Sequence, residues 1–341
     1  MRIQAHKDLQ QLHTFGVPWQ ATVFCAIDSV EDAVKTVRYA IEYNMPMLVL
    51  GGGSNMLPTV DYPGLVIKNE LGGRSVIDIN EQEIILHIGA GENWHDLVMW
   101  TVESGYYGLE NLALIPGTVG GAVVQNIGAY DVDLGRFIER VECIDLGTGE
   151  EKIFESSECG FGYRTSVFKE NQGRWMVTGV TLRLAKQFVP VVPYKPLQEK
   201  LGDSVSQLSA TDVMNAVIEI RQSKLPDWNM VGTAGSFFGN PRLTDEQIRE
   251  LQARFPDMPV FNNYGTGKHT VPAGWLIEQS GIDGELKNKY LYPKHHLIVV
   301  NNTKNTDQTS GQEIAEFTRL VQQQVREMFG VELTPEVVVL I

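Results

Sequence analysis

The chain has 341 residues, which predicts about two domains at roughly 150 residues each. Hydrophobic residues make up 43% and charged residues 21% of it, an ordinary globular composition that excludes a disordered, collagen-like or coiled-coil chain. The 28 basic and 42 acidic side chains leave a net charge of −14. A chain this acidic repels polyanions, so we expect no nucleic-acid partner.

The cysteines and the lengths of the apolar runs indicate where in the cell the protein is expected. Cys25, Cys143 and Cys159 are odd in number and far apart, with no Cys-x-x-Cys pair, which argues against a disulfide framework and a zinc ribbon. The first 16 residues lack the apolar stretch of a signal peptide, and no run reaches the ~20 apolar residues of a membrane helix. We therefore expect a cytoplasmic protein with no membrane partner.

Hydrophobic periodicity predicts a strand-rich first half. Asp28 or Ser29 can cap a helix that Pro46 stops. In chain order the predicted elements are a helix to about Asn44, strands over 47–50, 64–68 and 83–89, a helix from Trp94 to near Gly105, and strands over 140–146, 152–155 and 174–184. The turn at 147–149, Gly-Thr-Gly, predicts a hairpin between the fourth and fifth of these strands.

The pattern changes after about Ala185. Pro190, Pro193 and Pro196 crowd one connecting stretch, which marks a domain boundary. Helices are then predicted over 211–224, 244–255, 273–280 and 310–329, and strands over 297–301 and 337–341. The chain contains no internal repeat or low-complexity tract, so the sequence predicts an α+β architecture, strand-rich before the boundary and helix-rich after it.

Two glycine clusters lie in the strand-rich half, and the first of them follows a predicted strand. In the first, 51–55, Gly-Gly-Gly-Ser-Asn, the glycines let backbone N–H groups approach an oxyanion closely, and a diphosphate is the natural guest. This cluster fails the dinucleotide pattern because Met56 takes the third glycine position, and it fails the P-loop pattern because no Gly-Lys-Ser/Thr follows. A plain tight turn is an equal alternative.

The second cluster covers 116–122, Pro-Gly-Thr-Val-Gly-Gly-Ala, and continues into 126–130, Asn-Ile-Gly-Ala-Tyr. Taken alone, it is better interpreted as a loop packed between layers. Two such loops in one strand-rich half could nevertheless grip a long cofactor from both ends.

These loops and six further segments resemble the MurB family of peptidoglycan-synthesis flavoenzymes. The resembling segments are 51–55, 89–94, 108–130, 161–166, 224–226, 234–241, 273–277 and 333–337, and they run in family order through nearly the whole chain. The resemblance implies an α+β fold with an FAD-binding domain of the PCMH or vanillyl-alcohol-oxidase type, in subdomains 1–70 and 71–188. A smaller α+β substrate-binding domain would cover 189–341, and its last strand could return to the FAD domain.

The resemblance also implies noncovalent FAD, since none of the three cysteines lies in a glycine loop. It assigns the cofactor to both glycine clusters, at Gly51, Gly52, Gly53, Ser54, Asn55, Pro116, Gly117, Gly120, Gly121, Asn126, Gly128, Ala129 and Tyr130.

Three residues match the family's catalytic groups. Arg164, in Phe-Gly-Tyr-Arg-Thr-Ser, would bind the enolpyruvyl carboxylate through its fixed fork of donors. Ser236, in Ala-Gly-Ser-Phe-Phe, would donate a proton, and Glu336 near the C-terminus would be the third group. Without the resemblance, the plainer interpretations are a surface arginine, a turn serine and a solvated glutamate.

Four more residues match the substrate site. Tyr194 lies in the proline-rich stretch and resembles the tyrosine of a loop that closes over the uridine nucleotide in the type I branch. Lys224 and Asn240 match substrate contacts, and Arg221 is a weaker match. Cations near a helix C-terminus are also favoured by the helix dipole, which is the alternative for Arg221 and Lys224.

The resemblance implies a reaction in two halves. NADPH would reduce FAD, and UDP-N-acetylglucosamine enolpyruvate would then receive hydride from flavin N5 at C3 and a proton from Ser236 at C2. Arg164 and Glu336 would stabilise the enolate, Glu336 by hydrogen bonding or in its protonated form. We expect a monomer and no metal.

The sequence departs from the family at two places, and two other functions stay open. His13 replaces a usual asparagine, and His295-His296 stands where relatives often carry amides near the diphosphate, so that phosphate contact stays unassigned. Another PCMH-fold flavoenzyme, such as an oxidase of a small alcohol or sugar, would share the glycine loops. A non-enzymatic nucleotide-binding protein would share them too, but neither needs Ser236, Asn240 and Glu336 in these contexts.

Overall fold

The computed structural model describes residues 2–202, 207–262 and 268–341. These form two compact units. The first contains the described residues of Met1–Lys7, Ala21–Gly52 and Tyr62–Ser223, and the second contains those of Asp8–Gln20, Gly53–Asp61 and Lys224–Ile341. The division of the chain at residues 70 and 188 stays a prediction.

A four-stranded sheet and one helix open the first unit. The strand order is β1 (Arg2–Asp8), β2 (Gln20–Ile27), β5 (Tyr62–Asn69) and β3 (Met47–Leu50), with β5 parallel to both β2 and β3. Helix α1 (Val30–Glu42) begins at Ser29, whose hydroxyl accepts a hydrogen bond from Asp32 N at 3.2 Å. Its buried face, with Ala33 and Val37, packs against the strands, so the predicted helix and cap are confirmed.

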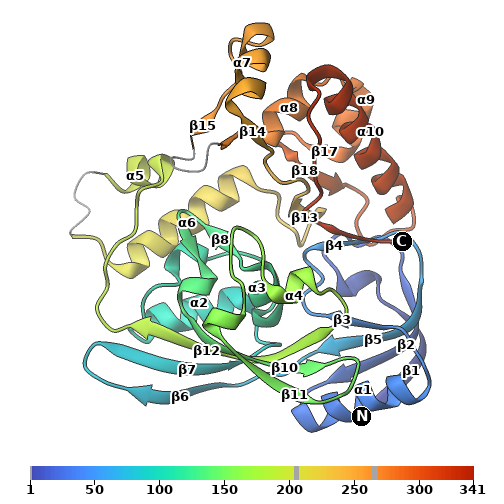
Figure 1. The fold of residues 1–341 in the computed structure, drawn as a ribbon, viewed down its shortest axis with the longest axis vertical. Coiled ribbons are helices and arrows are strands. Elements are labelled where there is room, and N and C mark those ends of the chain that lie inside the picture. Colours follow the sequence, from blue (N-terminus) through green and yellow to red (C-terminus); the bar gives the residue numbers. More distant parts are fainter. Residues whose placement is uncertain (1, 203–206, 263–267) are drawn as a thin grey trace. The chain divides into compact units, whose positions relative to one another are not determined.

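The second sheet of this unit is antiparallel and carries most of its helices. Its order is β11 (Glu151–Glu155), β10 (Ile138–Asp145), β12 (Trp175–Ala185), β7 (Glu83–Gly89) and β6 (Arg74–Ile79). The predicted hairpin is the pair β10–β11. Figure 1 shows α2 (Trp94–Glu103), α3 (Val119–Gln125) and α6 (Ala210–Lys224) on one side of this sheet, where one apolar cluster joins all three to it.

The helices that follow the proline-rich stretch share this core. Leu197 of α5 (Lys195–Leu201) and Val213 and Val217 of α6 are fully buried in the same cluster as the sheet residues Leu86 and Val180. The remaining short elements of the first unit are α4 (Val167–Glu170), β8 (Gly128–Ala129), β9 (Val132–Asp133) and the 3₁₀ turns 110–112, 134–136 and 156–158.

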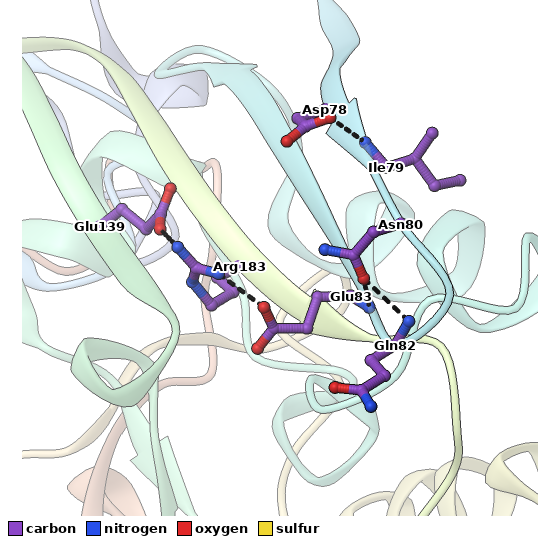
Figure 2. A network of polar contacts seen from close by, with 7 residues as sticks. All are labelled: Asp78, Ile79, Asn80, Gln82, Glu83, Glu139 and Arg183. Carbon is purple, nitrogen blue, oxygen red and sulfur yellow. Dashed lines mark hydrogen bonds and ion pairs between the residues drawn. The ribbon is translucent and has the colours of Figure 1, made fainter.

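Ion pairs and hydrogen bonds connect the strands at one exposed end of the antiparallel sheet (Figure 2). Arg183 of β12 reaches Glu83 of β7, with Nη1 2.6 Å from Oε2, and also bonds Glu139 of β10. Asn80 Oδ1 accepts from the backbone N–H groups of Gln82 and Glu83 and closes the β6–β7 turn. Because these ion pairs lie in solvent, they fix strand register more than they add stability.

Three small sheets are formed by the described residues of the second unit. They are β13 (Gly232–Ser236), β18 (His295–Asn301) and β17 (Leu291–Tyr292); β14 (Arg242–Thr244), β16 (Lys268–Thr270) and β15 (Phe261–Asn262); and the parallel pair β19 (Val338–Leu340) and β4 (Met56–Pro58). The helices are α7 (Asp245–Arg254), α8 (Ala273–Gln279), α9 (Gly284–Tyr290) and α10 (Gly311–Phe329), with a 3₁₀ turn at 10–12. Their core includes Phe237 and Phe238, both fully buried.

The structure confirms each predicted helix and strand to within a few residues at its ends. Periodicity did not predict several elements, and one of them, β2, carries a clear apolar run over 23–27 that was available in the sequence. β13, Gly-Thr-Ala-Gly-Ser, has no apolar run, and the exposed β6 depends on its pairing with β7. In the part of the chain that the structure describes, no helix combines the length and apolar character needed to span a bilayer.

Candidate functional site

The first unit holds two backbone segments in close contact, one from each glycine cluster. A methyl group at Gly52 would lie 2.6 Å from Gly117 Cα, and one at Gly51 would lie 2.5 Å from Thr118 Oγ1. Real Cβ atoms essentially never come closer than 3.0 Å to a neighbour. Glycine is therefore required at Gly52, where the neighbour is backbone, whereas a side chain at Gly51 would displace the Thr118 hydroxyl.

Between these backbones lies a hydroxyl without a partner. Thr118 precedes α3 as its N-cap residue, but its side chain makes no capping bond. Its Oγ1 is buried and bonds to nothing in the protein. A buried, unsatisfied hydroxyl costs free energy unless a ligand satisfies it. This orphaned donor, together with the backbone cradle, fits a bound phosphate group of the expected cofactor.

A half-buried cation beside these two backbones was not predicted from the sequence. Lys68 stands opposite Leu50 in the β3–β5 pairing, and its Nζ donates to Gly51 O, the first residue of the loop. Burial lowers the pKa of Lys68 from its ordinary value. A lysine that ends the buried run Leu65–Ile67 was the available signal, since apolar strands seldom carry a cation inward without a use for it.

The rest of the first cluster, Gly53 to Asn55, belongs to the second unit. Gly53 has φ +60°, and a Cβ there would meet the backbone of His13. Thr14 N donates to Gly53 O at 3.0 Å. Ser54 is half-buried, and Asn55 Nδ2 donates to Glu336 O at 3.0 Å, so this amide is used within the protein.

The second cluster is held by internal hydrogen bonds. Gly120 N donates to Ala90 O at 2.8 Å, while Pro116 is half-buried and Gly121 lies within α3. Asn126, in the left-handed conformation with φ +39°, ends α3. Its Nδ2 donates to Gly162 O at 2.7 Å, and its Oδ1 accepts from Gly135 N at 2.8 Å. Its backbone N–H also donates, to Val123 O at 3.0 Å, so Asn126 is bonded mainly within the protein.

The β8–β9 hairpin, which contains Gly128 and Ala129, holds Arg164. Arg164 Nη2 donates to Gly128 O, and Nη1 lies 3.9 Å from Asp133 Oδ1. The backbone of Arg164 is left-handed, with φ +53°, and its guanidinium lies 5.3 Å from the ring centroid of Tyr163. The side chain is 29% exposed, so a positioned, half-buried cation is presented here.

A second cation of the first unit lies near Arg164. Arg221 of α6 donates from Nε to Leu114 O at 3.2 Å and bonds the Tyr130 hydroxyl. Burial, and then repulsion from Arg164, lower the pKa of Arg221. Among the described residues no carboxylate pairs with Arg221 within 4.0 Å. Two neighbouring guanidiniums with so little compensation favour an anionic ligand.

Tyr194 stands beside this pair. Its ring packs edge-to-face on Tyr130, with centroids 5.2 Å apart, and is 39% exposed. Asn111, which is 2% exposed and was not predicted, donates from Nδ2 to Tyr130 O at 3.0 Å and to Val191 O at 2.8 Å. It thus ties the glycine-rich loop to the proline-rich stretch that carries Tyr194.

The segments that carry Ser236 and Glu336 pair with each other in the second unit. Ser236 ends β13 after Gly235, whose φ of +75° and local register shift turn the strand, and its side chain is exposed. Glu336 N donates to Phe237 O at 2.9 Å, and Phe238 pairs with Pro335. A methyl group at Gly239 would lie 3.1 Å from Glu336 Oε1. The proposed acid and the half-buried carboxylate thus belong to directly hydrogen-bonded segments.

Asn240 and Lys224 are the other predicted site residues of the second unit. Asn240 Oδ1 accepts from Ala273 N at 2.9 Å, at the start of α8, which leaves its amide donors for a ligand. Lys224, at the end of α6, is exposed and helps to lower the pKa of His295, although burial is the larger cause. His295 Nδ1 is buried without a partner, so the unassigned phosphate contact stays open at this position.

The structure therefore groups the predicted residues by unit. Arg164, Arg221 and Tyr194 belong to the first unit and Ser236, Asn240, Lys224 and Glu336 to the second. Across the described residues, no group of three or more His, Cys, Asp or Glu side chains is arranged to hold a metal ion.

Comparison with known proteins covers the chain from end to end. Residues 21–154 match the family model of the FAD binding domain, and residues 226–340 match that of the C-terminal domain of UDP-N-acetylenolpyruvoylglucosamine reductase. The chain is 42% identical to the Chromobacterium violaceum UDP-N-acetylenolpyruvoylglucosamine reductase, over 100% of this chain and 99% of the relative. It is 41% identical to that of Pseudoalteromonas atlantica over 97% and 93%. The solved structure of the Thermus caldophilus enzyme covers both chains fully, with a TM-score of 0.67 and 25% identity.

Proposed function

This chain belongs to the UDP-N-acetylenolpyruvoylglucosamine reductase family and is a flavin-dependent oxidoreductase, and we propose that it uses NADPH to reduce UDP-N-acetylglucosamine enolpyruvate to UDP-N-acetylmuramate. The observation that carries the proposal is the hydrogen-bonded junction of the Ser236 and Glu336 segments. That junction joins the backbone segments that carry a protic side chain and a carboxyl, which supports assigning both residues to the protonation of one enolate.

The residues expected to hold FAD are the Gly51–Gly52 and Gly117–Thr118 backbones, the Thr118 hydroxyl and Lys68. When bound, FAD supplies the redox chemistry, since a flavin accepts two electrons from a reduced nicotinamide and delivers a hydride to a polarised double bond. The proposed attachment is noncovalent. All three cysteines are buried, and burial raises the pKa of Cys159 to about 12, which disfavours a covalent link through that thiol.

Ser236 is the proposed general acid, with its Oγ proton delivered to C2 of the substrate. Its exposed position at the end of β13 suits contact with a ligand, because Phe237 and Phe238, which follow it, are buried and fix the backbone beneath it. A serine hydroxyl is a weak acid, so it serves only where a strongly basic carbanion or enolate develops beside it.

Arg164 and Glu336 are the proposed stabilisers of that enolate. The fork of Arg164 is held by Gly128 O and by the distant Asp133 carboxylate, which leaves donors for a substrate carboxylate. Glu336 would donate a hydrogen bond from its carboxyl group to the developing negative charge.

The remaining substrate-binding residues are assigned from their charge and their free hydrogen-bond donors. Arg221 lacks a carboxylate partner among the described residues, and Lys224 is exposed, so both suit the diphosphate of the nucleotide. Tyr194 would close over the uridine, and Asn240 would bind with the amide donors that its contact to Ala273 leaves open. We also propose that the chain acts as a cytoplasmic monomer in peptidoglycan precursor synthesis, on which cell shape and division depend.

The experiment compares the two half-reactions by stopped flow. Ser236→Ala should leave flavin reduction by NADPH nearly intact and slow reoxidation by the enolpyruvyl substrate by about 10²-fold or more. Ser236→Cys keeps a protic side chain and should keep part of the second rate. An equal loss in both half-reactions would contradict the assignment of Ser236.

The main rival is an oxidase on the same flavin-binding fold. Such an enzyme would reoxidise with molecular oxygen and would gain nothing from the enolpyruvyl nucleotide. Reduced protein that is oxidised by air faster than by the nucleotide would favour that rival.

A further inference from the structure

We infer that Asn55 is a positioning residue for Glu336, an inference that rests on the proposed role of Glu336 in catalysis. Sequence analysis assigns Asn55 to the cofactor. In the structure its side-chain amide is committed elsewhere, since Nδ2 donates to the backbone carbonyl of Glu336 at 3.0 Å. Both residues belong to the second unit.

The bond lies at the start of the parallel pair β4–β19. Met56 stands opposite Val338, Val338 N donates to Asn55 O at 3.1 Å, and Thr59 N donates to Leu340 O at 3.0 Å. Figure 1 shows the C-terminus of the chain beside β4. In this ladder the donors of β4 and the acceptors of β19 advance two residues at a time, so two steps back from Thr59 and Leu340 a regular ladder would pair Asn55 N with Glu336 O.

At that step the side chain replaces the backbone. A regular ladder would use the N–H of Asn55 for Glu336 O, which would force the end of the glycine loop into strand geometry. Because Nδ2 makes the bond instead, the loop can turn immediately before Met56 while Glu336 stays anchored. Asparagine suits this position because aspartate lacks the donor.

The anchor completes the fixation of the Glu336 backbone. Its N–H is held by Phe237 O at 2.9 Å, beside Ser236, and its C=O is held by Asn55. The carboxyl group lies against Gly239, where Oε1 is 3.1 Å from the position of a Cβ atom. Without the Asn55 bond, only the backbone N–H of Glu336 would be hydrogen-bonded and its C=O would be free. The carboxyl group would then be less well positioned to stabilise negative charge on the substrate.

The test separates this role from cofactor binding. Asn55→Ala should speed hydrogen exchange in the 333–338 segment, and should slow substrate-driven flavin reoxidation by about tenfold. Its FAD dissociation constant and its rate of flavin reduction by NADPH should stay within about threefold of the wild type. Hydrogen exchange needs no activity and reports the anchor directly.

Thr59→Val is the matched control. Thr59 Oγ1 also donates to a backbone carbonyl of β19, Leu340 O at 2.6 Å, at the far end of the same ladder. Because Thr59 N bonds the same carbonyl, the ladder survives this change, and reoxidation should keep its wild-type rate.

Three outcomes overturn the inference. They are unchanged exchange in 333–338 for Asn55→Ala, a tenfold loss of FAD affinity with normal reoxidation, and an undiminished effect of Asn55→Ala in a Glu336→Ala background. The last shows that the effect does not pass through Glu336. Failure of the proposed function looks different: Glu336→Ala alone would then reoxidise at the wild-type rate, while the exchange and FAD measurements would still judge the anchor.

Discussion

Replacing Thr118 by valine should change the stability of the apoprotein and its FAD affinity in opposite directions. The buried Oγ1 of Thr118 has no partner, and the residue makes no capping bond to α3. Valine has nearly the same shape and removes the unsatisfied group. A buried hydroxyl left unpaired costs about 1–3 kcal/mol, so the free energy of unfolding of the apoprotein should rise by about 1 kcal/mol.

In the holoprotein, the same change should remove a hydrogen bond to the FAD phosphate and weaken FAD binding. A hydrogen bond to a charged phosphate is worth about 1.5–3 kcal/mol, and every 1.4 kcal/mol is about tenfold in affinity. The FAD dissociation constant should therefore rise by about ten- to a hundredfold. Denaturant unfolding of the apoprotein and fluorescence titration with FAD measure the two effects on one preparation.

Thr101→Val is the matched control in the same unit. Thr101 is fully buried, but its Oγ1 donates to Val98 O at 2.9 Å. Its replacement should lower the free energy of unfolding by about 1 kcal/mol and leave FAD affinity unchanged. If Thr118→Val raises stability without weakening FAD binding, the hydroxyl is merely unsatisfied and its assignment to the cofactor is wrong.

Three further predictions concern the same fold. Gly52→Ala would place a methyl group 2.6 Å from Gly117 Cα, so the two loops must part by about 1 Å; FAD titration should show an affinity loss of about tenfold or more. The His87–Glu142 hydrogen bond raises the pKa of His87 above 6.5 and lowers that of Glu142 below 4.5. The pair therefore adds to the free energy of unfolding between pH 4.5 and 6.5, and this contribution is lost above the pKa of His87 and below that of Glu142 in the folded protein. His87→Gln should lower the melting temperature more at about pH 5.5 than at about pH 8.5. Equal shifts of the melting temperature would disprove the coupling. Tyr194→Phe should raise KM for the nucleotide with little change in kcat, and a change in kcat alone would point to the chemical step.

The elements and the motifs were predictable because they are local. Ser29 capped a helix and the apolar run 47–50 formed a strand, as periodicity and capping rules require. The glycine loops were predictable for the same reason, because consecutive glycines report close backbone approach wherever they occur.

The partners of side chains were not predictable, since they depend on long-range pairing. Asn55 and Asn126 were expected to face the cofactor, yet their amides bond Glu336 O and Gly162 O. Lys68 and Asn111 were missed, because nothing near them in the sequence shows that they reach Gly51 O or Val191 O. Such contacts join residues up to 281 positions apart.

Asparagine side chains in and beside the glycine loops compensate for the flexibility of the glycines. A glycine-rich loop exposes its backbone to a ligand but has no side chains with which to pack, and glycine loses more conformational freedom than any other residue when it is ordered. Asn55, Asn111 and Asn126 supply the missing constraint, because each donates from Nδ2 to a backbone carbonyl of another segment. These bonds order the loops before any cofactor arrives, so less of the binding free energy is lost to ordering them. The amides therefore serve as cross-links, and we propose that recognition of the anionic cofactor depends on backbone N–H groups, the unpaired Thr118 hydroxyl and the half-buried Lys68.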